Sequence, residues 1–428
     1  MNKMKRWKIY RSILVVLLGI SIATIGFVMY LDVWRKTPDT IKIKAGVLQD
    51  IDLKVPLSGV AYPEMVETSG NAKSENVESL YINLENSVTF FAKEENNYKI
   101  NFKLFGIIPF KSVEIEVIKD FKVIPAGFPI GIYVKTAGIL VIDVGTFLGM
   151  DGMEYSPSDN LLLEGDYITK INYEEVTSKT DFMDKIGSCN GEQVILTVNR
   201  KEEIFDIRIQ PILNQSNEYK VGIWIRDSAQ GVGTMTFISE DYSFGALGHG
   251  INDTDTSQLM KLEMGNLYNT EIISITKGKN GSPGELTGII RYTQDNIIGN
   301  IEVNENQGIF GKCSASLLES VVMEPMSIGL KQEIEIGPAK ILACIDETPK
   351  LYDVEITEIN FDNDNKNRGI TLKVTDESLL AITGGIVQGM SGSPIIQNDK
   401  LIGAVTHVLV KDATRGYGTF IENMILMR

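Results

Sequence analysis

The sequence predicts a mainly β protein that follows one apolar N-terminal helix. Three observations lead to this fold class. Residues 13–31 carry no charge, short runs of alternating apolar and polar residues recur over about 35–120, and glycine punctuates a β-rich C-terminal half with few strong helix patterns. Many short strands with glycine turns are typical of a β-barrel or sandwich. A chain of 428 residues has room for about two to four domains, each with its own core.

Residues 13–31 are predicted to form a transmembrane helix. An uncharged stretch of this length covers about 28 Å as a helix, nearly the hydrocarbon thickness of a bilayer. Residues 1–12 are basic, which predicts a cytoplasmic N-terminus and an extracytoplasmic body. A cleaved signal peptide is the alternative, but the apolar run is long for one and no Ala-x-Ala-like site follows it. We therefore expect an uncleaved membrane anchor.

The composition excludes several classes of function. The formal charge is −15, and because the first eleven residues contribute five positive charges, the rest carries −20. Such an acidic body is a poor match for nucleic acid or an anionic membrane surface. The three cysteines are widely spaced and form no Cys-x-x-Cys or Cys/His cluster, so we expect neither a metal site nor a disulfide framework.

Residues 35–122 are predicted to form a small β domain. Apolar residues alternate with polar ones at Leu80, Ile82 and Leu84, and again over 98–104 and 113–117. A polar stretch from Glu67 to Asn76 interrupts this pattern as a loop. The sequence of this domain does not indicate what it binds.

Residues 125–212 contain a more specific order of elements. Short strands are expected at 131–134 and 138–142, followed by the run Leu162-x-x-Gly165-Asp166-x-Ile168-x-x-Ile171-Asn172, then Val176, a helix near 180–186, and strands at 194–198 and 205–209. This segment resembles PDZ domains of the protease-associated bacterial type.

The PDZ resemblance implies a groove that takes a peptide by strand addition, between strand 131–134 and the helix at 180–186. The residues expected to line it are Ile130, Gly131, Ile132 and Tyr133. The strand begins Phe128-Pro-Ile-Gly-Ile instead of the usual Gly-φ-Gly-φ, which favours an internal segment as ligand over a free C-terminus. A packing module with an unused groove is the alternative.

A serine between glycines stands near the C-terminus, in Gly389-Met-Ser391-Gly-Ser-Pro394, with apolar strand-like runs on either side. Glycine gives the backbone the freedom to aim amide groups at an oxyanion, as a nucleophilic serine requires. In a chymotrypsin-like loop the amides of Gly389 and Ser391 would be the two donors. The Gly-x-Ser-x-Gly motif, the nucleophile elbow of hydrolases, is excluded, because Ser393 occupies the position of its last glycine. A tight turn between two buried strands is the alternative.

The chain has two histidines, so an imidazole base has two candidates. His249 lies between two glycines in a loop or at a strand end, as a general base needs. The alternative is a turn histidine whose partner is Asp253 or Asp255. His407 follows an alternating strand pattern and is expected in the core or a pocket wall.

Ala246-Leu-Gly-His249-Gly and Gly389-Met-Ser391-Gly-Ser-Pro-Ile395 together resemble the SpoIVB peptidase family, the sporulation serine peptidases of endospore-forming bacteria. The order of anchor, PDZ domain and peptidase domain also agrees with that family. The resemblance implies a trypsin-like β-barrel peptidase over 213–428 without a cofactor. It further implies secretion from the forespore into the space between the two engulfing membranes and self-cleavage. The implied target is a membrane-bound inhibitory complex, whose cleavage releases processing of the sigma-K precursor.

The family triad of His, Asp and Ser maps onto His249, Asp376 and Ser391. The aspartate is open on sequence grounds, because four others compete for the role: Asp253, Asp255, Asp346 and Asp353. A non-catalytic PDZ scaffold, whose C-terminal β domain only binds partners, is the alternative from a different class of function.

Overall fold

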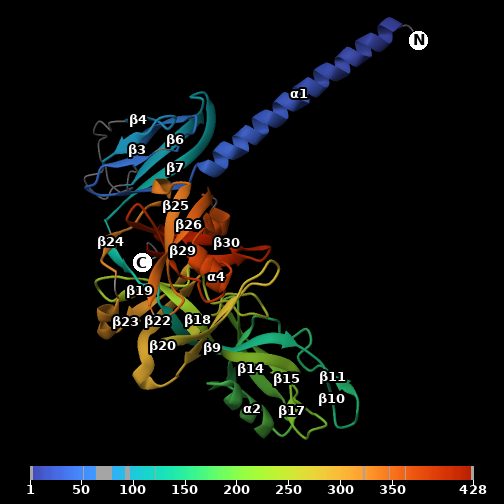
Figure 1. Ribbon diagram of the computed structural model, residues 1–428. Helices are drawn as coiled ribbons and strands as arrows, with labels where there is room; N and C mark the ends of the chain where they lie inside the picture. The colour runs from blue at the N-terminus through green and yellow to red at the C-terminus, as the bar shows by residue number, and fades with distance from the viewer. Residues whose placement is uncertain are drawn as a thin grey trace, which may run out of the picture.

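The computed structural model describes residues 3–51, 53–63, 80–91, 97–120, 122–321, 323–346, 348–361 and 363–425. It confirms a mainly β chain behind one apolar helix. Figure 1 shows the long helix α1 (Lys3–Lys36), a small β domain, a central body, and a unit that carries α2 (Lys179–Ser188) at the far end of the molecule.

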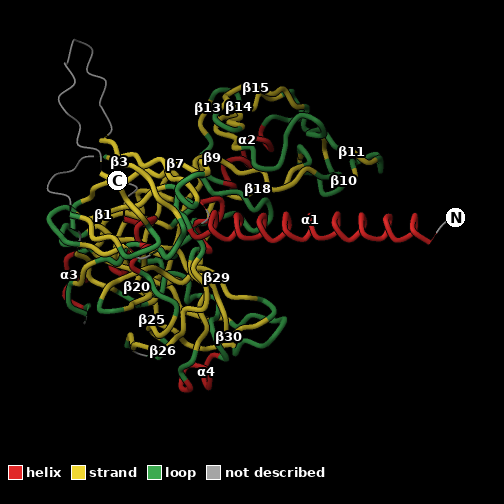
Figure 2. The backbone as a smooth tube through the Cα atoms, turned by 90° about the horizontal axis from the view of Figure 1, so that it is seen from above, coloured by secondary structure: helices red, strands yellow, loops and turns green. Residues whose placement is uncertain are grey.

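Helix α1 extends away from the rest of the chain (Figure 2). Its segment Trp7–Lys36 is long and apolar enough to cross a membrane, because it contains an 18-residue stretch with a mean hydropathy of 2.5. Its C-terminal end packs onto the small β domain, where Val33 is buried in the core. The helix is therefore held at one end by the domain that follows it.

The small β domain contains a five-stranded sheet. Its strand order is β1 (Thr40–Lys44), β7 (Ile108–Ile118), β6 (Tyr98–Leu104), β3 (Leu57–Pro63) and β4 (Leu80–Asn83). Beside it, β2 (Gln49–Ile51) pairs with β5 (Val88–Phe90). The alternation read from the sequence is confirmed, because Ile100, Phe102 and Leu104 are all buried. The loop expected at Glu67–Asn76 lies outside the described residues.

The PDZ-like unit has a core of its own, which includes Ile139, Ile168, Phe182 and Leu196. Helix α2 begins after Ser178, whose hydroxyl accepts a hydrogen bond from the amide of Asp181, as in a typical N-cap. The expected helix and the strands at 194–198 and 205–209 are present, whereas the two strands expected at 131–134 and 138–142 are parts of one long strand, β9 (Pro129–Val144). The strands of this unit are β10 (Phe147–Leu148), β11 (Glu154–Tyr155), β12 (Tyr167–Ile171), β13 (Glu174–Glu175), β14 (Val194–Arg200), β15 (Glu203–Ile209), β16 (Ile212–Leu213) and β17 (Tyr219–Lys220).

Six strands of the central body pair in a closed circuit, which we call the first ring. In order of pairing they are β9 (Pro129–Val144), β20 (Leu262–Thr276), β22 (Ile297–Glu305), β23 (Gly308–Cys313), β19 (Ser243–Ala246) and β18 (Ile223–Ile238), which returns to β9. Ile132, Met235, Phe244 and Leu267 lie in its core. The flanking strands are β8 (Lys122–Pro125), β21 (Glu285–Ile290) and β24 (Met326–Ser327).

A closed barrel of six strands forms the second ring. Its strands are β25 (Gly337–Cys344), β26 (Pro349–Ile359), β27 (Ile370–Val374), β30 (Asp412–Phe420), β29 (Lys400–Leu409) and β28 (Pro394–Gln397). Ile341, Ile356, Leu372 and Val405 lie in its core. Helix α4 (Glu377–Thr383) follows β27, and the serine loop lies between α4 and β28. Two further helices are α3 (Ala315–Ser320) and α5 (Ile421–Ile425).

The predicted peptide groove along Ile130, Gly131, Ile132 and Tyr133 must be corrected. Each of these residues is paired on both edges, with β18 on one side and β20 on the other. Ile132 is also 5% exposed. A peptide cannot add to a strand whose two edges are already hydrogen-bonded. The reason is that β9 continues beyond the PDZ-like unit, so residues 129–136 belong to the first ring and only 139–144 to that unit.

The strand beside α2 is instead the beginning of β18. The carboxylate of Asp227 accepts a hydrogen bond of 2.8 Å from the amide of Lys179, at the start of α2. Among the described residues, 223–226 pair with β9 alone and Asp227 lies at a shift of register, so this end of β18 keeps one edge unpaired.

Candidate active site

The serine loop sits directly on the first ring. Gly392 has a φ of +99°, and a Cβ placed there would lie 2.0 Å from the carbonyl oxygen of Thr234 and 2.6 Å from the amide of Leu247. Only glycine fits such an approach. The contact between the two rings therefore requires a glycine at position 392, directly after Ser391.

Two threonines of β18 bind the carbonyl groups of the serine loop. The hydroxyl of Thr234 donates to the carbonyl of Gly389 over 2.7 Å, and the hydroxyl of Thr236 donates to that of Gly392 over 2.8 Å. The amide of Thr234 also donates to the carbonyl of Ser391 over 2.9 Å. These three bonds tie the catalytic candidate of the second ring to a strand of the first.

The amides along the serine loop alternate between paired and unpaired. Those that donate to backbone carbonyls are the amides of Gln388, Met390, Gly392 and Ser393. Among the described residues, none accepts a hydrogen bond from the amide of Gly389 or of Ser391. Gly389 has a φ of +95°, a conformation that favours glycine. An oxyanion hole needs such free, fixed amides, and these are the two that the sequence predicts.

His249 lies in the loop after β19, and a neighbouring turn holds that loop. The amide of Gly250 donates to the carbonyl of Asn306 over 3.3 Å, and the side chain of Asn304 bonds both backbone groups of Ile251. Nδ1 of His249 is 2.9 Å from the carbonyl oxygen of Gly250. Because a carbonyl can only accept, we assign the proton to Nδ1, which leaves Nε2 free to act as a base. Burial lowers the pKa of His249, so the ring is neutral at pH 7.

Two adjacent residues of β29 contact the two catalytic candidates. The hydroxyl of Ser391 donates to the carbonyl of Thr406 over 2.7 Å. The ring of His407 lies 5.0 Å from that of His249, at an interplanar angle of 35°. His407 keeps an exposed edge, yet partial burial and the charges of His249 and Arg368 lower its pKa to about 4. The structure therefore places Ser391 and His249 beside two adjacent residues of β29. His407 is exposed there, so the expectation of a core position for it is wrong.

Asp376 does not lie at the place on β29 where Ser391 and His249 come together. Its carboxylate caps α4, where it accepts hydrogen bonds from the amides of Ser378 and Leu379 over 2.9 and 3.0 Å, and it also accepts one from the amide of Asp353. The Ser378 hydroxyl, with these amides, lowers the pKa of Asp376. The pairing of the strands shows how far Asp376 lies from His407. Thr371 of β27 and His407 of β29 both pair with Tyr417 of β30. Asp376 follows Thr371 by five residues, roughly 16 Å along an extended chain. This geometry does not support a contact with His249, and the catalytic role of Asp376 stays a prediction.

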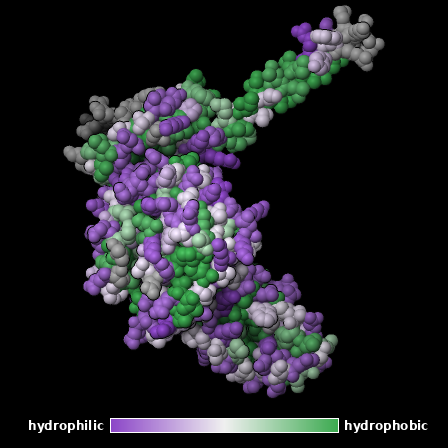
Figure 3. Space-filling model, viewed as in Figure 1, coloured by the Kyte–Doolittle hydropathy of each residue, from purple (hydrophilic) through white to green (hydrophobic). Residues whose placement is uncertain are grey.

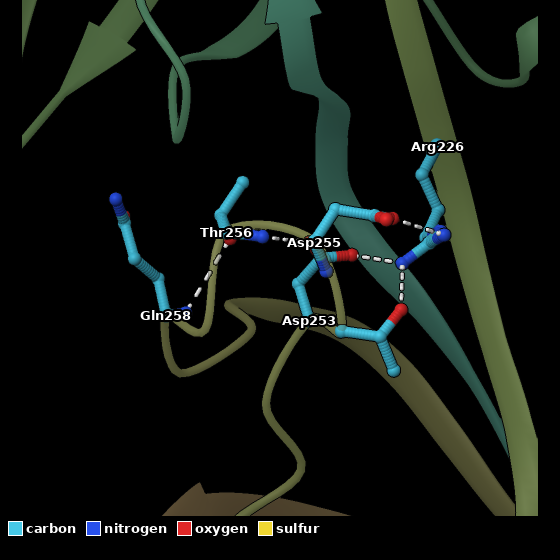
Figure 4. A network of polar contacts seen from close by, with 6 residues as sticks. Arg226, Asp253, Asp255, Thr256 and Gln258 are labelled. Carbon is cyan, nitrogen blue, oxygen red and sulfur yellow. Dashed lines mark hydrogen bonds and ion pairs between the residues drawn. The ribbon is translucent and has the colours of Figure 1, made fainter.

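The four competing aspartates have other partners. Figure 4 shows Asp253 and Asp255 bound to the guanidinium of Arg226, the latter at 2.7 Å. Asp253 also accepts from the amides of Asp255 and Thr256, which closes the turn after the histidine loop. Asp346 pairs with Lys350, and Asp353 pairs with Lys340. Among the described residues, no hydrogen bond joins any of these carboxylates to His249, so the alternative of a turn histidine satisfied by Asp253 or Asp255 is not supported.

Sequence reasoning missed the threonines that assemble the site, Thr234, Thr236 and Thr406. Threonine is common in β-strands for its branched side chain alone. Nothing in the local pattern marks these three as partners of a loop that lies far along the chain.

Residues 217–425 match the family model described as SpoIVB peptidase S55. No curated protein matches the chain. Among solved structures, the chain is similar to the PDZ domain of the SdrC-like protein from Listeria monocytogenes. The two are 23% identical over 21% of this chain and 87% of that one, with a TM-score of 0.18. Residues 217–425, which carry both His249 and Ser391, thus form a serine peptidase domain of the SpoIVB family.

Proposed function

We propose that the protein is a membrane-anchored serine endopeptidase in which Ser391 is the nucleophile and His249 is the general base. One observation carries this assignment. The two motifs, from different rings, meet at the adjacent residues Thr406 and His407 of β29. Helix α1 supplies the anchor. The chemistry requires no metal or cofactor.

In the proposed reaction the hydroxyl of Ser391 turns from the carbonyl of Thr406 to Nε2 of His249. Its oxygen attacks the scissile carbonyl carbon while the imidazole takes the proton. The amides of Gly389 and Ser391 bind the oxyanion, and the imidazolium then gives its proton to the leaving amine. Water hydrolyses the resulting acyl-enzyme in the same way. The carbonyl of Gly250 keeps Nδ1 protonated, which is the orienting task that an aspartate performs in a triad.

We further propose an extracytoplasmic location, in the space between the membranes of an engulfed forespore. The proposed substrates are the protein itself and a membrane-bound inhibitory complex whose cleavage releases sigma-K processing. The family resemblance supports these targets, and the apolar helix supports a substrate close to the membrane. Reconstituting the full chain in vesicles and mapping new termini by mass spectrometry tests self-cleavage. We expect fragments from the wild type and none from Ser391→Ala. An intact wild type would contradict self-cleavage and favour the scaffold alternative.

The PDZ-like unit is proposed to control when cleavage begins. The unpaired edge of β18 beside α2 can take a segment of this chain or of a neighbour. The same strand continues to Thr234 and Thr236, which hold the serine loop. Occupancy of that edge can therefore bias the position of the loop through one continuous strand.

Asp227→Ala tests this control, because it releases α2 from β18. We expect the rate of self-cleavage in vesicles to change, and hydrolysis of a short soluble peptide by the same variant to change with it, because both reactions use the serine loop that β18 holds. Asp206→Ala is the matched control, since Asp206 binds Thr197 within the same unit and away from α2. Equal self-cleavage in both variants and the wild type would reduce the unit to a packing module.

A further inference from the structure

The turn between β6 and β7 exposes three large apolar side chains, which we call the hairpin tip. Phe105 is 57% exposed, Ile107 is 80% exposed and Ile108 is 53% exposed. Elsewhere β6 buries its apolar residues and exposes its polar ones. Apolar side chains that gather at an exposed tip mark a contact with another apolar phase.

The hairpin is fixed against the C-terminal end of α1. The ring of Phe110 lies 5.3 Å from that of Tyr30 and 5.5 Å from that of Trp34, edge to face with both. Lys111 lies 4.8 Å above the Trp34 ring and pairs with Asp39 at 2.8 Å. Val33, on the same end of the helix, is buried in the core of the small β domain. Helix and hairpin therefore move as one body.

The hairpin tip lies on the membrane side of this contact. Ile108 shares a face of β7 with Phe110 and lies about 7 Å beyond it along the strand. That distance equals the rise of four to five helical residues. Since Phe110 meets the helix between Tyr30 and Trp34, the tip lies level with the end of the uncharged stretch 13–31. Figures 1 and 3 show the hairpin and the apolar helix leaving the domain on the same side.

We propose that the hairpin tip inserts into the interfacial region of the same phospholipid bilayer that α1 spans. Tyr30 and Trp34 lie where aromatic side chains anchor a helix at the membrane surface. The exposed Lys103 at the base of the hairpin suits the headgroup region. A single helix leaves the body free to swivel over the membrane, whereas a second contact fixes its orientation. The bilayer is favoured over a protein partner because the tip is continuous with the membrane-spanning helix.

Quenching of tryptophan fluorescence by brominated acyl chains tests this proposal on the full chain, reconstituted in phosphatidylcholine vesicles. Ile107→Trp places a reporter at the tip. Leu48→Trp is the control, because Leu48 is 69% exposed and follows β1, which ends beside Ile118 at the opposite end of β7. The signal of the three native tryptophans is subtracted. We expect quenching of the added fluorescence to be at least about threefold stronger at 107 than at 48, because only the tip reaches the acyl chains.

Equal quenching at both positions would overturn the proposal. A blue-shifted emission at 107 without quenching by bromine would also overturn it, since the tip would then lie against protein. Phe105→Trp gives a second reporter. Adding Ile107→Asp to it should lower the quenching to the level of Leu48→Trp, because the tip then loses its most exposed apolar side chain. Unchanged quenching in this double variant would contradict the proposal, because the apolar side chains of the tip would then not be what brings it to the acyl chains.

Discussion

The two rings of the central body each have six strands, yet they are assembled differently. All strands of the second ring come from one contiguous segment, 337–420. The first ring begins with β9 and resumes with β18 after the PDZ-like unit, and both strands extend into that unit. Each ring contributes one catalytic candidate, since His249 follows β19 and Ser391 precedes β28. The catalytic pair is therefore a property of how the rings dock, and neither ring holds it alone.

The interface between the two rings is polar where Ser391 and His249 come together. Hydroxyl groups of the first ring satisfy carbonyl groups of the second, and Thr236 is fully buried there. A buried acceptor that loses its donor costs more than the bond itself contributes, so these contacts specify a single docked arrangement.

Replacing Ser391 or His249, the catalytic candidate of each ring, should have the largest effect on kcat. We expect Ser391→Ala and His249→Ala each to lower kcat by about 10³-fold or more without changing the melting temperature. The double variant should be no worse than the worse single variant, because the two groups act as a unit. Peptide hydrolysis by purified full-length variants provides the measurement. Robust activity in either single variant would refute the assignment.

Weakening the contact between the two rings, without changing Ser391 or His249, should have an intermediate effect on kcat. Thr236→Val leaves the carbonyl of Gly392 without its donor, at an expected cost of about 1–3 kcal/mol in unfolding free energy. Displacement of the serine loop should lower kcat by about tenfold to a hundredfold. Thr357→Val is the matched control, because Thr357 donates to Thr371 within the second ring. Equal loss of activity in the two variants would argue against a special role for the contact between the rings.

The two imidazoles should be separable by their pH dependence. A general base must be neutral, and burial holds the pKa of His249 below its usual 6.5. The acid limb of kcat/KM should thus have its midpoint below pH 6.5, with activity lost only as the pH falls through it. His407 has a pKa of about 4, so it is still neutral at pH 6.5. His407→Ala should retain turnover within about tenfold and keep the limb, as expected of a residue outside the proton transfer. Loss of activity in His407→Ala alone, with His249→Ala active, would reverse the choice of base.

Asp376→Asn should have the smallest effect. Asparagine caps helices about as well as aspartate, so stability should change by only a few tenths of a kcal/mol. The structure engages the carboxylate at α4, and we therefore expect kcat within a few-fold of the wild type. A fall in kcat of about 10²–10⁴-fold at unchanged stability would show that Asp376 reaches His249 and would restore the triad implied by the family.

The sequence predicts those features whose causes are local. The uncharged helix, the alternating strands of the small β domain and the capped helix α2 follow from spacing and composition, as do the glycine-framed Ser391 and His249. The division of β9 between the first ring and the PDZ-like unit could not be predicted, because the pattern of apolar and polar residues along a strand is the same in either sheet. The capping role of Asp376 could not be predicted either, because the sequence pattern does not indicate the short helix α4 that follows it. The threonine contacts join segments far apart in the sequence and have no local signal.

Covalent labelling by a serine-reactive phosphonate tests the central claim most directly. The full chain is incubated with the reagent, and the modified residue is located by mass spectrometry. The account predicts labelling at Ser391 in the wild type and in Ser393→Ala, a control at a buried serine two residues away. It predicts no labelling in Ser391→Ala and strongly reduced labelling in His249→Ala. A label on any other residue, or one that persists in Ser391→Ala, would contradict the proposed active site.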